Sequence, residues 1–219
     1  MTAAIPPDLS VALFAGIALG CRRGGRAVFA GINFALGAGD ALALTGPNGS
    51  GKSSLLRVMA GLLPPAAGLL RWQGAPVADE PEAHRARLAY LGHLDAVKPA
   101  LSVGENLAFW IDFHAGDAGS RDAALERFDL LELADLPARY LSAGQRRRLA
   151  LARIAAVPRP LWLLDEPSTG LDRESIAALE QAIAEHRAGG GIVVLSTHAA
   201  LDLPGARALD LGADAQVAA

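Results

Sequence analysis

Short apolar runs alternate along the chain with longer segments in which apolar residues recur at helical spacing. The runs are four or five residues long and rich in Leu, Val or Ile; they cover residues 41–45, 88–91, 161–165 and 192–196. Such runs are typical of strands buried on both faces of a parallel sheet. Their alternation with helical segments predicts an α/β fold with helices covering a mostly parallel sheet.

Other segments add to this plan. In the stretch 27–36, Val28, Ile32 and Phe34 stand at even spacing, which predicts an antiparallel strand with one covered face. Helical spacing covers residues 52–61, 103–115, 121–131, 143–157 and 173–186. The second of these helices opens with Ser102 and Glu105, which can form a capping box.

The stretch between two prolines, Pro99 and Pro158, contains helical patterns and no convincing strand. We therefore expect a helical subdomain, roughly residues 95–157, inserted into the sheet of one domain that spans residues 1–219. The tail after Gly212 is Ala-rich and is expected to fray.

Composition narrows the class of protein. The 20 Lys and Arg residues nearly balance the 23 Asp and Glu residues, so no nucleic-acid-coating surface is indicated. Cys21 is the only cysteine, which excludes an intramolecular disulfide. Uncharged stretches such as 9–21 fall short of the ~20 residues of a membrane-spanning helix. No basic residue precedes Arg22, so a secretory signal is not indicated and a cytoplasmic location is expected.

The segment TGPNGSGKSS, residues 45–54, follows the first buried run directly and contains the pattern G-x-x-x-x-G-K-[ST] from Gly46 to Ser53. Glycines let backbone N–H groups surround a phosphate, and the following helix adds its positive N-terminal dipole. We expect Lys52 to lie along the β- and γ-phosphates of a nucleotide and the Ser53 hydroxyl to bind Mg²⁺. The predicted nucleotide-binding residues are Gly46, Pro47, Asn48, Gly49, Ser50, Gly51, Lys52, Ser53 and Ser54.

A glycine-rich turn without a ligand is the alternative interpretation. A chance match in a chain of this composition is on the order of one in a thousand. In addition, 18 of the 20 basic residues are Arg, yet one of the two lysines stands where a compact ammonium is required. Both observations favour the phosphate-binding loop.

Polar side chains follow two of the other predicted buried strands. Asp165 and Glu166 end the run LWLLDEP, and His198 follows the run that ends at 196. Buried acids require a cation or hydrogen bonds. We expect Asp165 to bind Mg²⁺ and Glu166 to deprotonate the attacking water. His198 is expected at the same sheet edge, in contact with the γ-phosphate.

A further helix begins within LSAGQRRRLALAR, residues 141–153, with an apolar face that includes Leu149, Ala150, Ile154 and Val157. By itself this start is an ordinary N-cap at Ser142, and the run 146–148 is expected to be a solvated face.

Taken together, the segments 46–53, 141–145, 161–166 and 169–172 and His198 stand in the order and spacing of ABC-type ATPase subunits, and the chain resembles that family from about residue 9 to residue 212. The resemblance implies a P-loop NTPase (RecA-like) core and a head-to-tail homodimer that binds two ATP molecules with Mg²⁺. Ser142, Gly144 and Gln145 of one subunit would complete the site begun by Lys52 of the other. Asp172 would lie at the dimer seam, and the arginine run would stay on the surface.

Two positions depart from the family pattern. His93 or Leu94 stands where a Gln usually joins the helical insert to the sheet, and His93 is a candidate metal ligand. Arg23 stands where an aromatic residue usually stacks on adenine. Arg can also stack on a base, by a cation–π contact.

A narrower resemblance is to the ATP-binding subunits of haem exporters of bacterial cytochrome c maturation. It is carried by LGCRRGGRAVFAGINFAL, the YLGH…VK replacement of the Gln loop, LSAGQRRRLALARI and STHAALDLPGARALDLG. It implies a peripheral ATPase on the cytoplasmic face of the inner membrane, with integral membrane permease subunits as partners. One of these would place a coupling helix near residues 94–108. Trp110 and Phe113 are expected in the core of the helical subdomain.

The sequence bears on three alternative functions. The first is the ATPase of another exporter, for example a lipoprotein-releasing or multidrug system, which the catalytic motifs do not exclude. The second is a soluble ABC-type ATPase acting on DNA or ribosomes, which is disfavoured because the chain has neither heptads nor a duplicated loop. The third is a GTPase, but none of the asparagines precedes a lysine, as the base-reading motif N-K-x-D requires.

Overall fold

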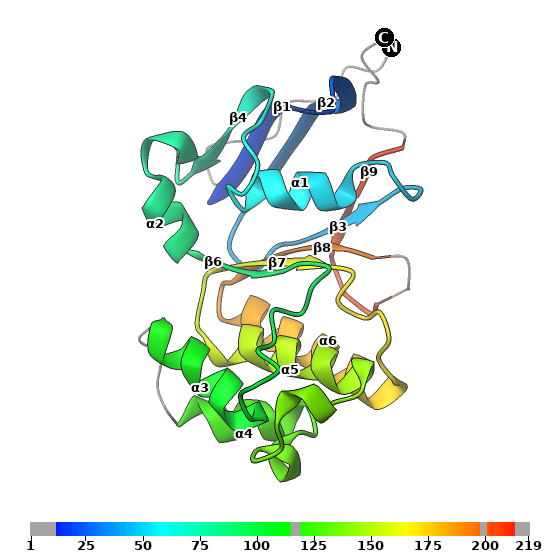
Figure 1. Ribbon diagram of the computed structural model, residues 1–219. Coiled ribbons are helices and arrows are strands. Elements are labelled where there is room, and N and C mark those ends of the chain that lie inside the picture. Colours follow the sequence, from blue (N-terminus) through cyan, green and yellow to red (C-terminus); the bar gives the residue numbers. More distant parts are fainter. Residues whose placement is uncertain (1–11, 115–118, 198–200, 213–219) are drawn as a thin grey trace.

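The fold has two sheets and a helical layer (Figure 1). It is seen in a computed structural model that describes residues 12–114, 119–197 and 201–212. Within these ranges a parallel sheet lies at the centre, an antiparallel sheet lies on one side of it, and α3 to α6 lie on the other side. Helix α1 lies between the two sheets. The α/β class and the P-loop NTPase architecture are confirmed.

The parallel sheet has the order β6-β7-β8-β3-β9. Its strands are β3 (Ala41–Thr45), β6 (Leu88–Leu91), β7 (Leu161–Asp165), β8 (Ile192–Ser196) and β9 (Arg207–Asp210). The first four coincide with the predicted strands residue for residue. Because the strands are parallel, their carboxyl ends meet at one edge of the sheet.

The antiparallel sheet has the order β2-β1-β4-β5. Its strands are β1 (Phe14–Arg23), β2 (Arg26–Leu36), β4 (Ala67–Trp72) and β5 (Ala75–Pro76). Strand β2 confirms the predicted antiparallel strand. Ile32 and Phe34 are buried there, and a register shift between Phe29 and Ile32 also turns Phe29 into the core while leaving Val28 half-buried.

The α-helices are α1 (Lys52–Met59), α2 (Pro81–Ala86), α3 (Val103–Phe113), α4 (Ser120–Arg127), α5 (Ala143–Ala156) and α6 (Arg173–Ala188). Three short 3-10 helices are η1 (Val77–Asp79), η2 (Leu131–Leu133) and η3 (Ala138–Tyr140). All five predicted helices are present, and α2 was not predicted. The capping box of α3 is confirmed: Ser102 Oγ accepts from the Glu105 amide at 3.1 Å, and Glu105 Oε2 accepts from the Ser102 amide at 2.7 Å.

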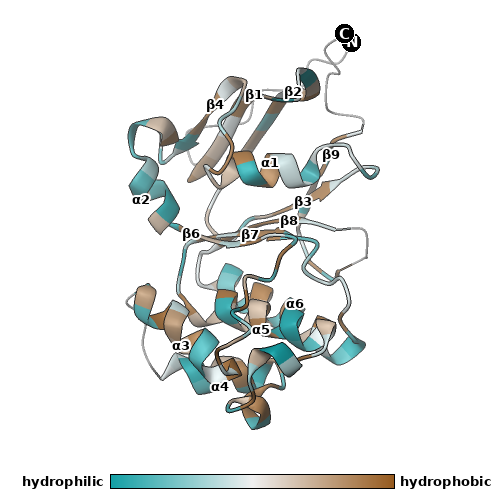
Figure 2. Cartoon of the chain, in the orientation of Figure 1, coloured by the Kyte–Doolittle hydropathy of each residue, from teal (hydrophilic) through white to brown (hydrophobic). Residues whose placement is uncertain are grey.

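The parallel sheet separates two hydrophobic cores, because its strands carry apolar residues on both faces (Figure 2). Leu161 and Leu163 pack with α1 and the antiparallel sheet. Trp162 and Leu164 point the other way and pack with α3 to α6. Cys21 is a buried packing residue of the first core.

The range 95–157 contains α3, α4 and α5, and within its described residues the only strand-like contact is an isolated bridge between Ser102 and Pro137. Helix α5 packs on β6 as well as on α3 and α4. The division of the chain into a core and a helical subdomain therefore stays a prediction. Across the ranges given above, no helix combines the length and apolar character needed to span a bilayer.

Candidate nucleotide-binding site

The glycine loop joins the carboxyl end of β3 to the start of α1. Gly51, the residue before the helix, has a φ of 104°. A Cβ there would lie 2.7 Å from Val28 Cγ1 and 3.0 Å from Phe29 Cδ1. Strand β2 therefore packs directly on the loop, and only glycine fits at this position.

Among the described α-helices, α1 is the one whose start has neither a side-chain cap nor an acidic residue in its first turn. Helices α3, α5 and α6 each begin with a side-chain cap, from Ser102, Ser142 and Asp172. Helix α1 has no side-chain cap and no acidic residue in its first turn. Its first amide groups, with the helix dipole behind them, suit a phosphate.

The side chains of the loop fit the same ligand. Lys52 is 6% exposed, and its ammonium donates to the carbonyls of Gly46 at 2.8 Å and Pro47 at 3.1 Å. Within the described part of the chain, Ser50 Oγ is buried and has no hydrogen-bond partner. A buried hydroxyl of this kind requires a partner, which a phosphate oxygen would supply.

Asp165 and Ser53 meet at the carboxyl edge of the parallel sheet, although they are 112 positions apart. Ser53 Oγ donates to Asp165 Oδ1 at 3.0 Å, and Ser196 Oγ donates to the same oxygen at 2.7 Å. Asp165 is 4% exposed. Ser196 was not singled out from the sequence. It ends β8, which lies between β7 and β3 in the sheet.

These oxygens fit Mg²⁺, which prefers oxygen ligands and keeps phosphate oxygens and water among them. Among the residues that the structure describes, no group of three or more His, Cys, Asp or Glu side chains forms an all-protein metal site. The share that the protein contributes would come from Ser53 and Asp165.

Glu166 follows Asp165 in the sequence, and hydrogen bonds hold its backbone in place. Its φ of 48° is in the left-handed region, which is unfavourable for a residue with a side chain. Its amide donates to Ser196 Oγ at 2.9 Å, and its carbonyl accepts from Arg147 Nη2 at 2.7 Å. Its carboxylate accepts from Thr169 Oγ1 at 3.3 Å.

Arg147 corrects the expectation that the run 146–148 is a solvated surface. Its side chain is 8% exposed and makes four hydrogen bonds, to Gly92, Asp95, Asp165 and Glu166. The signal was present in the sequence, because Arg147 stands three residues before the buried Ala150, on the apolar face of α5. Arg148 also differs from the expectation: its side chain is 15% exposed and pairs with Asp129 at 2.7 Å.

The residues predicted to act across a dimer seam lie on the opposite face of the parallel sheet from α1. Ser142 caps α5 in a capping box with Gln145: Ser142 Oγ accepts from the Gln145 amide at 3.1 Å, and Gln145 Oε1 accepts from the Ser142 amide at 2.8 Å. A Cβ on Gly144 would lie 3.1 Å from the Gly170 carbonyl, so the segment before α6 packs on this helix start. Asp172 caps α6, and hydrogen bonds from Ser175 lower the pKa of its carboxyl.

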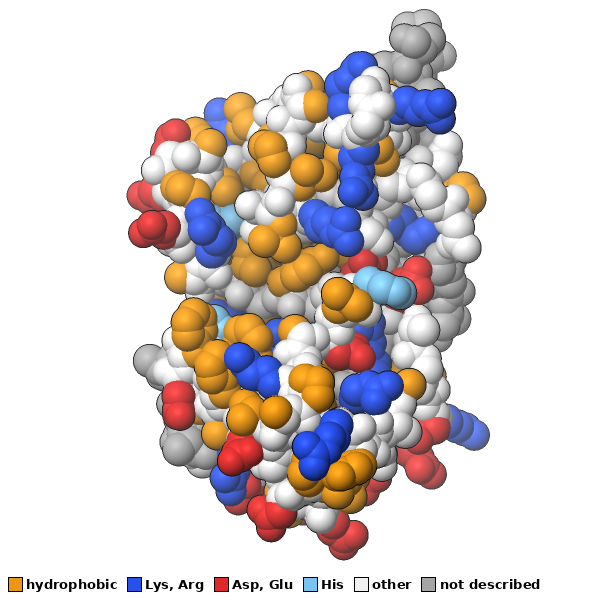
Figure 3. Space-filling model, in the orientation of Figure 1, with side chains coloured by type: hydrophobic (Ala, Val, Ile, Leu, Met, Phe, Trp, Pro, Cys, Tyr) orange, Lys and Arg blue, Asp and Glu red, His pale blue; other side chains and the backbone are white. Residues whose placement is uncertain are grey.

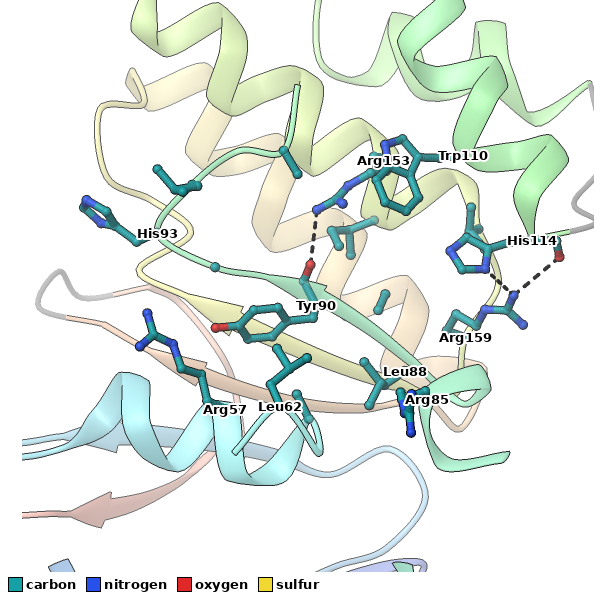
Figure 4. A pocket seen from close by; sticks show the side chains of 17 residues that line it. Arg57, Leu62, Arg85, Leu88, Tyr90, His93, Trp110, His114, Arg153 and Arg159 are labelled. Atoms are coloured by element: carbon teal, nitrogen blue, oxygen red, sulfur yellow. Dashed lines mark hydrogen bonds between the residues drawn. The ribbon is translucent and has the colours of Figure 1, made fainter. Parts of the chain in front are cut away.

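Three predicted residues lie at the margins of this site. Arg23 is exposed at the end of β1, opposite Arg26, on the hairpin whose strand β2 crosses the glycine loop. His93 is exposed in the loop after β6, and its ring points away from Tyr90 and Arg153 (Figure 4). Both roles stay predictions. His198 lies outside the described residues, two positions after the end of β8.

A groove of about 700 Å³ lies between the P-loop core and the helical region. Figure 3 shows this side of the molecule hollowed between its two halves. The lining includes four arginines and two histidines and contains no Asp or Glu: Arg57, Arg85, Arg153, Arg159, His93 and His114. The remaining walls are largely apolar.

The arginines and aromatic residues of the groove contact one another (Figure 4). Arg153 Nη2 donates to the Tyr90 carbonyl at 3.1 Å, and its guanidinium lies 4.7 Å from the Trp110 ring centroid. Burial lowers the pKa of Arg153 to about 10, so it stays charged at neutral pH. Trp110 is half-buried in the groove wall, and Phe113 is 69% exposed. The expectation of a core position is therefore wrong for Phe113, because α3 turns it away from α4 and α5.

Comparisons with known proteins agree on one family. The family model described as ABC transporter matches residues 29–169. A curated relative from Paramagnetospirillum magneticum, named cytochrome c biogenesis ATP-binding export protein CcmA, is 62% identical over 207 residues, which cover 93% of this chain and 95% of the relative. A relative of the same name from Rhodospirillum rubrum is 57% identical, covering 94% of this chain and 91% of the relative.

Solved structures agree at the level of the fold. The structure described as an ATP binding subunit of an ABC transporter has a TM-score of 0.78 at 27% identity, covering 85% of this chain and 79% of that one. A putative ABC transporter ATP-binding protein from Pyrococcus furiosus has a TM-score of 0.81 at 23% identity, covering 93% of this chain and 99% of that one.

Proposed function

The chain belongs to the ABC transporter family as an ATP-hydrolysing subunit, and from this premise we propose that its ATP hydrolysis drives the haem-export step of cytochrome c biogenesis. The observation that carries the proposal is the 62% identity to a relative named for cytochrome c biogenesis, over nearly the full length of both chains. The replacement of the usual Gln by the exposed His93 and Leu94 supports the same assignment.

In the proposed mechanism the glycine loop and the start of α1 bind the phosphates of ATP. The Lys52 ammonium, already buried against the loop, contacts the β- and γ-phosphates. Mg²⁺, when bound at Ser53 and Asp165, offsets the phosphate charge. Glu166 accepts the proton of the attacking water at its carboxylate, and His198 contacts the γ-phosphate.

The site is completed by a second copy of the chain. The start of α5 in the same subunit lies on the other face of the sheet, so it cannot reach the phosphates bound at α1. In a head-to-tail homodimer, Ser142, Gly144 and Gln145 of one subunit approach the γ-phosphate bound to the other. Asp172, which is exposed, lies at the seam between them.

We propose that the groove receives a helical segment of an integral membrane subunit, which places the chain peripherally on the cytoplasmic face of the inner membrane. Apolar side chains at the rim, Leu62 at 59% and Leu94 at 81% exposure, suit an apolar helix face. Since the groove contains four arginines and no acid, the segment that binds it is expected to carry Asp or Glu.

The groove assignment predicts that a reversed charge releases the chain from membranes. Arg85→Glu, in the groove, should lower the fraction of the chain that co-sediments with membranes carrying its partner subunits at least about fivefold, because an acid would face an acidic segment. Arg139→Glu is the matched control, because Arg139 stacks on Tyr140 and does not line the groove. Equal co-sedimentation of the two variants would contradict the assignment.

The transport role is tested by deleting the gene for this chain and staining membrane proteins for covalently bound haem. We expect holo-cytochromes c to disappear and to return when the wild-type gene is restored, whereas Lys52→Ala does not restore them. Normal cytochromes c in the deletion strain would instead point to another exporter, such as a lipoprotein-releasing or multidrug system.

A further inference from the structure

Arg147 links the end of β7 to the loop that follows β6, and no other side chain does so in the described hydrogen-bond network. Its Nη2 donates to the carbonyls of Asp165 and Glu166, each at 2.7 Å. Its Nη1 donates to the Gly92 carbonyl at 3.2 Å and to Asp95 Oδ1 at 2.9 Å. One planar group therefore contacts both the end of β7 and the loop that follows β6.

The first contact bears on the position of Glu166. That residue holds a left-handed backbone conformation, with a φ of 48°. Such a conformation persists in a residue with a side chain only where its neighbours fix it. The Glu166 carbonyl accepts from Arg147 and from the Thr169 amide, at 2.7 and 3.2 Å. The direction of the Glu166 carboxylate therefore depends on the Arg147 guanidinium.

The second contact bears on the loop at the groove. The loop leaves the sheet at Leu91, which pairs with Leu164 of β7. Farther along, Asn106 fixes Lys98, accepting from its amide at 2.7 Å and donating to its carbonyl at 3.0 Å. Between these anchors the exposed His93 and Leu94 line the groove, and Asp95 is tied to Arg147. A partner that displaces Leu94 therefore moves the residue next to Asp95, which is paired with Arg147.

Stability alone does not account for a buried arginine here. Burying a charge costs desolvation free energy that an ion pair only partly offsets, and an apolar side chain of similar volume often stabilises a fold equally well. Lysine would not replace it either, because a single ammonium cannot make the paired contacts of a planar guanidinium.

We propose that Arg147 is a positioning residue that transmits the state of the loop 92–95, and so the occupancy of the groove, to the backbone of Glu166. This inference rests on the proposed function, in which a membrane subunit occupies the groove. A seated partner holds the loop, the Asp95 contact holds the guanidinium, and the guanidinium keeps Glu166 directed at the attacking water.

The experiment compares three variants, as the isolated chain and in the detergent-purified complex with its membrane subunits. Arg147→Lys should lower kcat about tenfold or more and leave the KM for ATP unchanged, since a small misplacement of a catalytic group lowers the rate and the glycine loop is not touched. Asp95→Asn should lower the ratio of turnover in the complex to turnover of the isolated chain at least about fivefold. Asp129→Asn, which cuts the neighbouring Arg148 pair, is the control and should change neither quantity.

Two results would overturn the inference: a KM for ATP that rises in step with the loss of kcat in Arg147→Lys, or a wild-type turnover ratio in Asp95→Asn. Should Arg147→Lys not fold, Asp95→Asn decides alone, because its side chain is 25% exposed and tolerates an isosteric amide. Failure of the wild-type chain to co-purify with the membrane subunits would count against the proposed function. If the complex assembles and Asp95→Asn leaves this turnover ratio at its wild-type value, the result counts against the role of Arg147 and not against the proposed function.

Discussion

At the scale of single residues, the chemistry of the site depends on side chains that lie at the carboxyl edge of the parallel sheet. The ammonium of Lys52 is buried within the glycine loop. Asp165 accepts hydrogen bonds from the hydroxyls of Ser53 and Ser196. Glu166 stands beside them with its backbone fixed on both sides. The described part of the site therefore contains the side chains that the proposed phosphate cradle, Mg²⁺ site and proton-accepting carboxylate require.

Lys52→Ala is expected to weaken ATP binding at least about tenfold, because a charge-assisted hydrogen bond to phosphate is lost. Titration calorimetry with ATP measures the effect. Lys98→Ala provides a matched control, since Lys98 is the only other lysine and lies over the Phe109 ring, 4.3 Å from its centroid. Equal affinities for the two variants would contradict the phosphate role of Lys52.

Glu166→Gln is expected to lower ATP turnover by about 10²–10⁴-fold while ATP still binds, because the proton acceptor is lost and the cradle stays. The variant should also accumulate as an ATP-bound dimer, visible by size-exclusion chromatography with light scattering. Unchanged turnover would remove Glu166 from its proposed role.

At the scale of elements, the sequence predicted most where burial is uniform. Strands β3, β6, β7 and β8 were placed residue for residue because each is a short, largely apolar run, and β7 and β8 are buried at every residue. Strand β1 was missed because its Gly and Ala residues carry no periodic signal and its register shifts around Ala18, which has a φ of 48°. Ser196 was missed because its tertiary neighbours, and not a local pattern, define its role. Arg147 was missed because its charge outweighed its place on the apolar face of α5.

The packing of His186, on helix α6, makes the free energy of unfolding depend on pH. The His186 ring stacks on Trp162, with centroids 4.0 Å apart and planes 9° from parallel. Burial lowers the pKa of His186 to about 4. In the unfolded chain a histidine titrates near 6.5, so the unfolded state binds the extra proton first as the pH falls.

The stability contributed by neutral His186 is therefore complete above about pH 6.5 and is lost as the pH falls toward 4. After allowance for its partial exposure, we expect the free energy of unfolding to decrease by about 2 kcal/mol across that window from this residue. Urea titrations at several pH values measure it. His186→Phe should flatten the slope in this window, and an unaltered slope would contradict the assignment.

At the scale of the whole molecule, the parallel sheet separates the two halves of the proposed ATP site. Helix α1, with the proposed phosphate-binding loop before it, lies on one face, and the start of α5 lies on the other. Because one chain cannot bring the two together, the proposed site requires two copies arranged head to tail.

The most direct test of this central claim mixes two inactive variants, Lys52→Ala and Ser142→Arg. A mixed dimer has one site with the intact loop of the Ser142→Arg subunit and the intact α5 start of the Lys52→Ala subunit. In an equal mixture of freely exchanging subunits, ATP turnover should recover to about a quarter of the wild-type value, since half of the dimers are mixed and each has one complete site of two. Turnover no higher than that of the separate variants would show that the site is not shared between subunits.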